Sequence, residues 1–319
     1  MTDPTGRPAT GHPSSARIIG AALALTCGTL IPAQTRLNGA LGTALSDAYA
    51  GAVISFLGGL VVIVAIVVSR RSHRDGVVRV LRAVRTGQQP WWVLLGGCCG
   101  ALVVLSQTLT GAVLGAALFT VCTVAGQTTS ALVIDRAGLG PSAAMHLTVP
   151  RLVGAGLTIV AVVIGVSDRL AGGTSWWLAA MPLVAGLGLS FQSAVNGRVR
   201  EVGTLPVASL GNFTTGTTVL LLAWCVKLAA VGLPEHLPTQ WWLYLGGPIG
   251  LAYITINAGV VRHTGVLVLG LSSIAGQLLG SLGIDTLIPV AGRTPSLMTV
   301  IGVAVTLVAV AVTTLRSRT

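Results

Sequence analysis

The sequence predicts an all-α integral membrane protein, with ten transmembrane helices arranged as two related halves. Composition is the first observation: 53% of the 319 residues are hydrophobic, only 8% are charged, and the mean hydropathy is +0.85. Soluble domains carry about 25% charged residues, so this chain lacks the charged surface that a soluble fold of its size needs. The second observation is that apolar runs of about 20 residues, the length that crosses a bilayer, occur along almost the whole chain.

The third observation is an internal repeat, carried by four short motifs. Three of them recur at one offset of 150 residues: Trp91-Trp92 as Trp241-Trp242, Ala125-Gly126-Gln127 as Ala275-Gly276-Gln277, and Ile134-Asp135 as Ile284-Asp285. The fourth, Gln34-x3-Asn38-Gly39, returns as Gln192-x3-Asn196-Gly197 at an offset of 158, and the change of eight residues is a difference in loop length. The repeat divides the chain into residues 16–169 and 170–319, preceded by a tail, 1–15, whose Pro, Gly, Ser and Thr content predicts a disordered cytoplasmic segment.

We expect five membrane-spanning helices in each half. In the first half they lie at about 17–40, 47–69, 91–110, 113–134 and 151–167, and in the second at about 175–197, 204–227, 241–261, 264–284 and 297–315. The first span follows Arg17, and the later Ile31-Pro32-Ala33 gives it the look of a signal peptide. We interpret it as a retained span, because cleavage there would delete one member of the repeat.

The basic segment 70–90 is the longest internal connection between spans. Val77, Leu81 and Val84 fall on one helical face, with arginines around them, which predicts a short interfacial helix on the anionic inner leaflet. A solvated basic loop that anchors the topology is the alternative. Elsewhere, glycines spaced four apart predict close helix contacts; they are Gly96-x3-Gly100, Gly111-x3-Gly115, Gly246-x3-Gly250 and Gly276-x3-Gly280.

The distribution of basic residues predicts how the spans are oriented. An odd number of spans in each of two homologous halves requires that the second half be inverted relative to the first. With the N-terminus in the cytoplasm, 15 of the 19 basic residues lie inside and only Arg36, Arg169, Lys227 and Arg293 lie outside. This distribution satisfies the positive-inside rule and places both termini in the cytoplasm.

Composition and spacing also exclude several classes of function. A net charge of +11 would raise nucleic acid as a partner of a soluble protein, but here the charges lie between apolar spans and no nucleic-acid fold motif is present. The five cysteines fall inside predicted spans without CxxC spacing, so we expect packing residues rather than disulfides or zinc ligands. No nucleotide-binding loop is present, which argues against ATP-driven pumping by this chain alone. We expect no cofactor and no metal.

Ten spans in two inverted halves without a soluble domain resemble the drug/metabolite transporter superfamily. The paired Gln-x3-Asn-Gly motifs, the Trp-Trp at the start of the third span of each half and the Ala-Gly-Gln in the fourth resemble its YdcZ-like inner-membrane exporter branch, over nearly all of residues 17–315. Members of that branch are often a single five-helix unit, and this chain resembles a fusion of two. The resemblance implies a multi-pass protein of the bacterial inner membrane that exports a small molecule, and it supplies no substrate.

Intramembrane amides are the candidate solute-binding groups, because a polar side chain in hydrocarbon is costly unless it is paired or faces a cavity. Gln127 and Gln277 lie near the centres of their spans and occupy equivalent places. The other candidates form an expected outer and inner ring around this central pair; they are Gln34, Gln107, Asn38, Gln192, Asn257 and Asn196. Hydrogen bonding between helices is the alternative role for each of them, and Asn38 and Asn196 also precede a glycine, as residues at helix ends do.

The acidic pair Asp135 and Asp285 is the candidate for proton coupling, although both residues lie at span ends near water. No carboxylate lies at the centre of a span, so a neutral, zwitterionic or anionic solute fits the amides better than a cation does. Arg36 and Arg198 are placed where they could contact an anion, with topology as their alternative role.

The function that these observations favour is a secondary transporter that exports a small polar or amphipathic metabolite by alternating access between the two halves. An integral-membrane enzyme and a small-solute channel remain alternatives. The enzyme is disfavoured because no cluster of His and Asp or activated nucleophile is present, and sequence alone does not separate a channel from a transporter. The expected partners are the solute and the lipid bilayer, and the chain is a monomer or a homodimer.

Overall fold

The computed structural model describes residues 15–139, 147–173, 175–231, 236–289, 292 and 294–313, and within these ranges the chain is helical with no strand. The predicted tail, 1–15, lies outside the described residues except for Ser15, which begins the first helix. The first half contains α1 (Ser15–Gly28), α2 (Leu30–Ala44), α3 (Ala48–Ser69), α4 (Arg71–Arg85), α5 (Gly96–Arg136) and α6 (Val149–Ala171). The second half contains α7 (Trp177–Val202), α8 (Leu205–Val231), α9 (Gly246–Leu287) and α10 (Leu297–Thr313).

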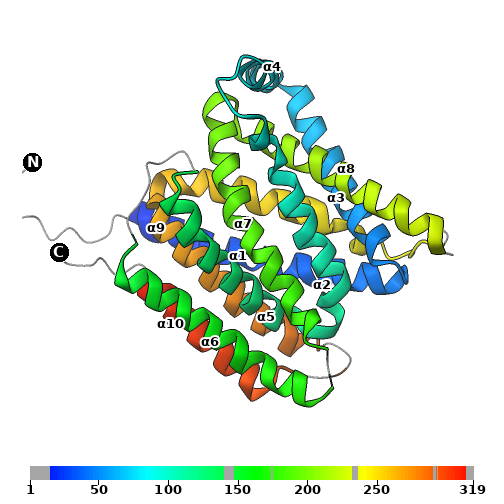
Figure 1. Cartoon of the computed structure of the whole chain (residues 1–319), viewed down its shortest axis with the longest axis vertical. Helices are drawn as coiled ribbons and strands as arrows, with labels where there is room; N and C mark the ends of the chain where they lie inside the picture. The colour runs from blue at the N-terminus through cyan, green and yellow to red at the C-terminus, as the bar shows by residue number, and fades with distance from the viewer. Residues whose placement is uncertain are drawn as a thin grey trace, which may run out of the picture.

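The helices of the two halves pack against one another in repeat-related pairs (Figure 1). At one edge α6 packs along α10, and at the opposite edge α3 packs along α8. Between these edges α5 packs on α7, and α1 packs on α9 in the equivalent contact. Helices α3 and α8 are equivalent in the two halves, as are α6 and α10, and the contact of α5 with α7 is equivalent to that of α9 with α1. The fold therefore has an approximate two-fold relation between its halves.

The first predicted span is two helices rather than one, because the helix is interrupted at Thr29 between α1 and α2. Pro32 lies just beyond the interruption and explains it. Proline has no backbone N–H to donate, and its ring clashes with the carbonyl group four residues earlier, which here belongs to Gly28. Pro182 has a different effect, since α7 continues through it.

The third and fourth predicted spans follow one another in α5 as two helical segments separated by a break at Gly115. Gly115 has φ 81° and ψ 168°, a backbone conformation that only glycine adopts without strain. The Asp285 carboxylate of α9 accepts hydrogen bonds from the Ala116 and Ala117 N–H groups at 2.9 and 2.7 Å, so it caps the segment that starts after the break. A short 3₁₀ turn precedes each long helix at the repeated Trp-Trp motif; the turns are η1 (Trp91–Leu95) and η2 (Trp241–Leu245).

The basic segment after α3 is the helix α4, as the first of the two alternatives predicted. Its buried face is formed by Gly76, Val80 and Ala83, and Leu81 of the predicted apolar face is 46% exposed. Whether that face contacts the inner leaflet stays a prediction. Arg79 fixes one side of the helix by donating from Nε to the Val202 carbonyl group at the end of α7.

Asp47 links α3 to α8 at one edge of the molecule. Its carboxylate accepts hydrogen bonds from the Tyr49 and Ala50 N–H groups, which makes it the N-cap of α3. The same carboxylate accepts from Trp224 Nε1 at 3.0 Å and pairs with Lys227 Nζ at 2.6 Å, both from α8. Burial raises the pKa of Asp47, but the hydrogen bonds from these groups and the Lys227 charge outweigh burial and hold that pKa below its usual range.

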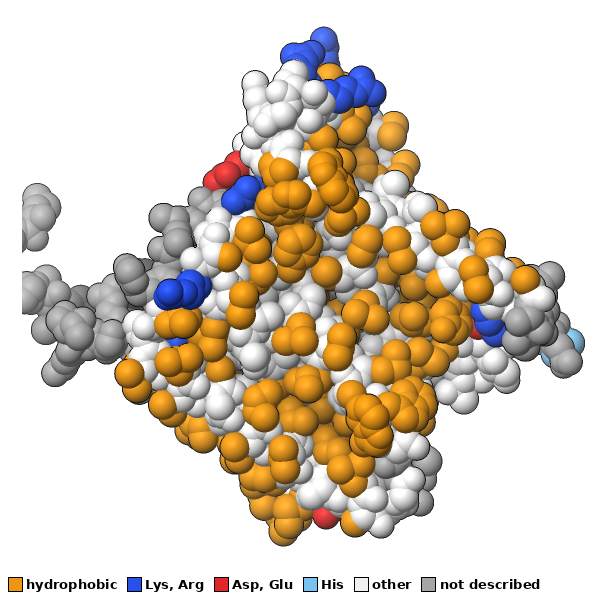
Figure 2. All heavy atoms as spheres, in the orientation of Figure 1, with side chains coloured by type: hydrophobic (Ala, Val, Ile, Leu, Met, Phe, Trp, Pro, Cys, Tyr) orange, Lys and Arg blue, Asp and Glu red, His pale blue; other side chains and the backbone are white. Residues whose placement is uncertain are grey.

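Apolar side chains cover much of the outer surface (Figure 2). Val61, Val163, Leu222 and Val226 are between 64% and 75% exposed, which a soluble protein avoids over such an area. Lysine and arginine side chains gather instead at the end of the molecule that carries α4 (Figures 1 and 2). Seven helical segments of the described residues are long and apolar enough to cross a membrane; they are Ile18–Ala44, Ala48–Ser69, Trp91–Arg136, Val149–Asp168, Trp177–Val202, Leu205–Ala229 and Val268–Leu287.

Glycines bring helices of opposite halves into backbone contact. A Cβ atom on Gly126 of α5 would overlap the Leu183 carbonyl oxygen of α7, and one on the equivalent Gly276 of α9 would overlap the Leu25 carbonyl oxygen of α1. Gly186 of α7 meets α5 in the same way. Of these three glycines, only Gly276 belongs to a predicted pair, and its contact with α1 is the close helix approach that the pair predicts.

Candidate functional site

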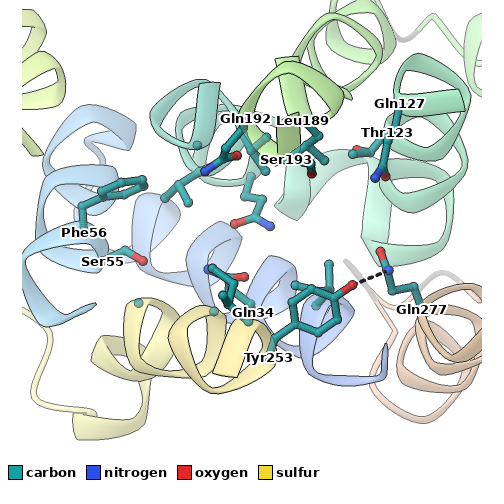
Figure 3. A pocket seen from close by; sticks show the side chains of 18 of the residues that line it. Gln34, Ser55, Phe56, Thr123, Gln127, Leu189, Gln192, Ser193, Tyr253 and Gln277 are labelled. Carbon is teal, nitrogen blue, oxygen red and sulfur yellow. Dashed lines mark hydrogen bonds between the residues drawn. The ribbon is translucent and has the colours of Figure 1, made fainter. Parts of the chain in front are cut away.

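A cavity of about 240 Å³ lies where the two halves meet (Figure 3). Its walls come from α2, α3 and α5 of the first half and from α7, α8 and α9 of the second. Residues at equivalent places of the repeat face it in pairs; these are Ile31 with Leu189, Gln34 with Gln192, Phe56 with Phe213, Gly100 with Gly250, and Gln127 with Gln277. The approximate two-fold axis therefore passes through the cavity.

Gln34 and Gln192 lie beside glycines of the opposite half. A Cβ atom on Gly250 would lie 2.6 Å from Gln34 Nε2, and one on Gly100 would lie 2.9 Å from Gln192 Nε2. Gln34 is 8% exposed, yet neither its amide nor that of Gln192 forms a hydrogen bond with any described residue. Buried amides normally have partners, so both amides have hydrogen-bonding capacity available for a molecule in the cavity.

Gln127 of α5 and Gln277 of α9 face one another, on the opposite side of Figure 3 from Phe56. Gln277 Nε2 donates to the Tyr253 hydroxyl group at 3.1 Å, and that hydroxyl lies 3.1 Å from Ser273 Oγ. The Gln127 side chain forms no hydrogen bond within the part of the chain that the structure describes. The equivalent amides therefore differ in this structure, because Tyr253 of the second half occupies the place of Val103 in the first.

Gln107 lines the cavity, but its amide is engaged in helix packing. Its Nε2 donates to Thr35 Oγ1 at 3.1 Å, and its Oε1 accepts from Asn38 Nδ2 at 2.6 Å, so it ties α5 to α2. Asn38 is fully buried outside the cavity wall, close to Gly246 at the start of α9. These two residues have the helix-linking role that the sequence left as an alternative.

Of the remaining two predicted amides, one lines the cavity and the other does not. Asn196 lines the cavity and lies near Gly96 at the start of α5. Asn257 is not among the lining residues; its Nδ2 donates to the Tyr253 carbonyl group at 3.0 Å and its Oδ1 accepts from Ser273 Oγ at 3.3 Å. The structure thus brings together six of the eight predicted amides: Gln34, Gln107, Gln127, Gln192, Asn196 and Gln277.

The described residues that line the cavity include no aspartate, glutamate, lysine, arginine or histidine. Arg36 donates to the Pro289 carbonyl group at 3.1 Å, and Arg198 donates to the Gly138 carbonyl group at 3.1 Å and lies over the Trp92 ring. Each arginine therefore binds a carbonyl group at the C-terminal end of a long helix of the opposite half, a favourable position for a cation. Neither one reaches the cavity.

The two predicted proton-coupling residues have different surroundings. Asp285 is 5% exposed and caps the α5 segment that begins after Gly115. Its counterpart Asp135 forms an ion pair with Arg151 of α6 and is 35% exposed. Neither residue lines the cavity, and a role in proton coupling stays a prediction. Among the described residues, no group of three His, Cys, Asp or Glu side chains is placed to hold a metal ion.

Comparison with known families identifies the chain. A family model described as "Putative inner membrane exporter, YdcZ" matches it twice, over residues 19–164 and 177–312. The chain belongs to this family. The two matched ranges are the two halves of the internal repeat, and membership places this YdcZ-family protein in the inner membrane as a multi-pass member of an exporter family.

Solved structures support the fold of the YdcZ-family protein. Five chains of solved structures match it, and one of them, described as "Crystal structure of protein", gives a TM-score of 0.54 at 21% identity, over 95% of this chain and 97% of that chain. A likeness at this identity shows the fold alone. A comparison with curated proteins finds no match.

The aromatic residues that line the cavity of this YdcZ-family protein were not predicted from its sequence. Phe56, Phe119 and Phe213 line the cavity, as does Tyr253. The signal was available for one pair, because Phe56 and Phe213 are each the ninth residue of their helices, α3 and α8. Their ring centroids lie 5.2 Å apart, so this aromatic pair of the cavity is itself built from equivalent residues.

Proposed function

We propose that this protein is a secondary transporter that exports a small polar or amphipathic metabolite by alternating access between two inverted five-helix repeats. One observation carries the proposal: unpaired glutamine amides from both halves face a single cavity at the repeat axis. Transporters built from repeats bind their solute at this interface, near the middle of the membrane.

Helix lengths support ten spans with the second half inverted. Helix α5 is broken at Gly115, and at about 1.5 Å per residue its segments before and after the break are each about 30 Å long, the hydrocarbon thickness of a bilayer. The 42 residues of α9 are likewise enough for two crossings. If each long helix crosses twice and α1 with α2 crosses once, the total is ten spans. Five crossings per half invert the second half, and the basic residues then favour cytoplasmic termini.

The surroundings of the cavity support movement of one half against the other. The closest backbone contacts between α5 and α7 and between α1 and α9 lie at glycines such as Gly126 and Gly276. Side chains also pack across the contact of α5 with α7, where Leu178 and Leu183 of α7 meet apolar residues of α5. A carrier of this kind opens the cavity to one side at a time by shifting such contacts.

The test is release of a metabolite panel from liposomes that contain the purified protein, with mass spectrometry of what leaves. We expect a small subset of solutes to leave, and we expect a member of that subset added outside to accelerate release, as exchange by a carrier requires. The double variant Gln127→Ala with Gln277→Ala should lose this release. The matched control is Gln88→Ala with Gln240→Ala, which changes two glutamines exposed between helices.

Three results would contradict the proposal. Release of no solute would remove the transport function. Release that is not accelerated by external solute would indicate a channel. Release that survives in the folded Gln127/Gln277 variant would move the solute away from the central amides.

A further inference from the structure

We infer that the transported solute is uncharged and planar, and carries a hydrogen-bond donor beside an acceptor, as carboxamides and lactams do on an aromatic ring. This inference rests on the proposed function and names the solute class of the same cavity. Three features carry it: the absence of charged lining side chains among the described residues, the unpaired amides, and the aromatic end of the cavity.

Charged groups near the cavity are already paired elsewhere, so an ionic solute would enter without a counter-charge. Asp285 accepts from the Ala116 and Ala117 N–H groups and thereby occupies the helix start that follows Gly115. Arg36 and Arg198 bind backbone carbonyl groups at helix ends. An ion buried in a region of low dielectric loses its hydration without compensation, which is costly.

The amides favour a partner that is both donor and acceptor. A glutamine carboxamide presents an N–H donor and a carbonyl acceptor side by side, and its best neutral partner presents the same pair in reverse order, as in bidentate contacts between amides and base edges. Gln34, Gln127 and Gln192 have both groups available, and Gln277 has its carbonyl oxygen available. A solute with an ester or hydrocarbon edge would leave these buried groups unpaired.

The shape of the cavity favours a flat ring. Phe56 and Phe213 lie together at one end of the cavity, with ring centroids 5.2 Å apart. The Gln192 and Gln34 amides lie over Gly100 and Gly250, which have no side chains to push them away. A planar solute can therefore reach these amides with its edge while its ring contacts the phenylalanines.

The test uses four probes of nearly equal size: nicotinamide, which is uncharged, its anionic counterpart nicotinate, its cationic counterpart 1-methylnicotinamide, and methyl nicotinate, which lacks the N–H donor. Binding to the purified full-length protein is measured by titration calorimetry at pH 7. We expect nicotinamide to bind at least tenfold more tightly than either ion and several-fold more tightly than the ester. The variant Gln127→Glu, which places a carboxylate in the cavity, should favour 1-methylnicotinamide, whereas Gln240→Glu outside the cavity should keep the wild-type order.

The liposome panel separates this inference from the proposed function. If nicotinate or 1-methylnicotinamide binds as tightly as nicotinamide to the wild-type protein, or if the released solutes carry net charge, transport stands and the inference is wrong. If no probe binds and the released solute lacks an amide-like edge, the inference is also wrong. If nothing is released, the proposed function falls and the inference falls with it. Should Gln127→Glu fail to fold, the order of the four probes on the wild-type protein decides.

Discussion

Replacing Gly126 by alanine tests the backbone contact that joins the two halves. The added Cβ atom would lie 2.9 Å from Leu187 N and 3.0 Å from the Leu183 carbonyl carbon, and it would overlap the Leu183 oxygen. Favourable carbon contacts begin at about 3.5 Å, so α5 and α7 must separate by more than about 0.5 Å along a fully packed interface. Overpacking of this kind costs about 1–3 kcal/mol of unfolding free energy.

Gly156→Ala is the matched control, because a Cβ atom on Gly156 of α6 meets nothing within 4 Å. Alanine favours a helix over glycine by about 1 kcal/mol, so this variant should be neutral or slightly stabilised. The two variants should therefore differ by about 2–4 kcal/mol. Gly276→Ala, at the equivalent contact between α9 and α1, should behave as Gly126→Ala does.

The assay is thermal unfolding in one detergent, followed by tryptophan fluorescence. Gly126→Ala and Gly276→Ala should unfold several degrees below the wild type, and Gly156→Ala should not. If Gly126→Ala matches Gly156→Ala in unfolding temperature, the close approach of α5 to α7 is refuted, and with it the glycine contacts along which the halves are proposed to move.

Two further predictions concern acidic side chains that hold helix ends. The charged Asp47 carboxylate stabilises the fold above the ordinary aspartate pKa of about 4, and this stabilisation is lost as pH falls through the lower pKa of the folded state. Asp47→Asn keeps the N-cap but loses the Lys227 ion pair. The unfolding temperature of this variant should therefore lie below that of the wild type at pH 7 and approach it below about pH 4. Gly115→Ala should destabilise the protein by about 2 kcal/mol or more, because its positive φ and the Asp285 carboxylate both oppose a Cβ atom. Gly87→Ala, with positive φ but open space, should destabilise it less, and equal unfolding temperatures for the two variants would contradict this prediction.

The amides of the cavity could be predicted because repetition and polarity are both visible in the sequence. An unpaired glutamine in an apolar span needs a reason, and its recurrence at an equivalent place points to the interface of the halves. Burial by itself did not separate the cavity residues from Asn38, which bonds to α5, and Asn257, which donates to the Tyr253 carbonyl group of its own helix and to Cys27 Sγ of α1. Which face of a helix turns inward depends on packing partners far away in the chain.

Helix ends were predicted less well than helix positions. Hydropathy marked α5 and α9 as two spans each, but the exact place where the second segment of α5 begins depends on the cap from Asp285, about 170 residues later in the chain. The aromatic residues were missed for another reason: phenylalanine in a membrane span is as compatible with lipid contact as with a cavity wall. Only the recurrence of phenylalanine at equivalent positions of both halves, as with Phe56 and Phe213, indicates a place at the cavity.

The cavity is built from equivalent residues, yet it is not symmetric. Val103 on one wall corresponds to Tyr253 on the other, and only Tyr253 brings a hydroxyl group to the amide beside it. In a homodimer of identical five-helix units, every substitution would occur twice, and a solute without its own two-fold symmetry would have two equal poses. Joining the units in one chain lets each wall change independently, so this protein can hold such a solute in a single orientation and distinguish its two ends.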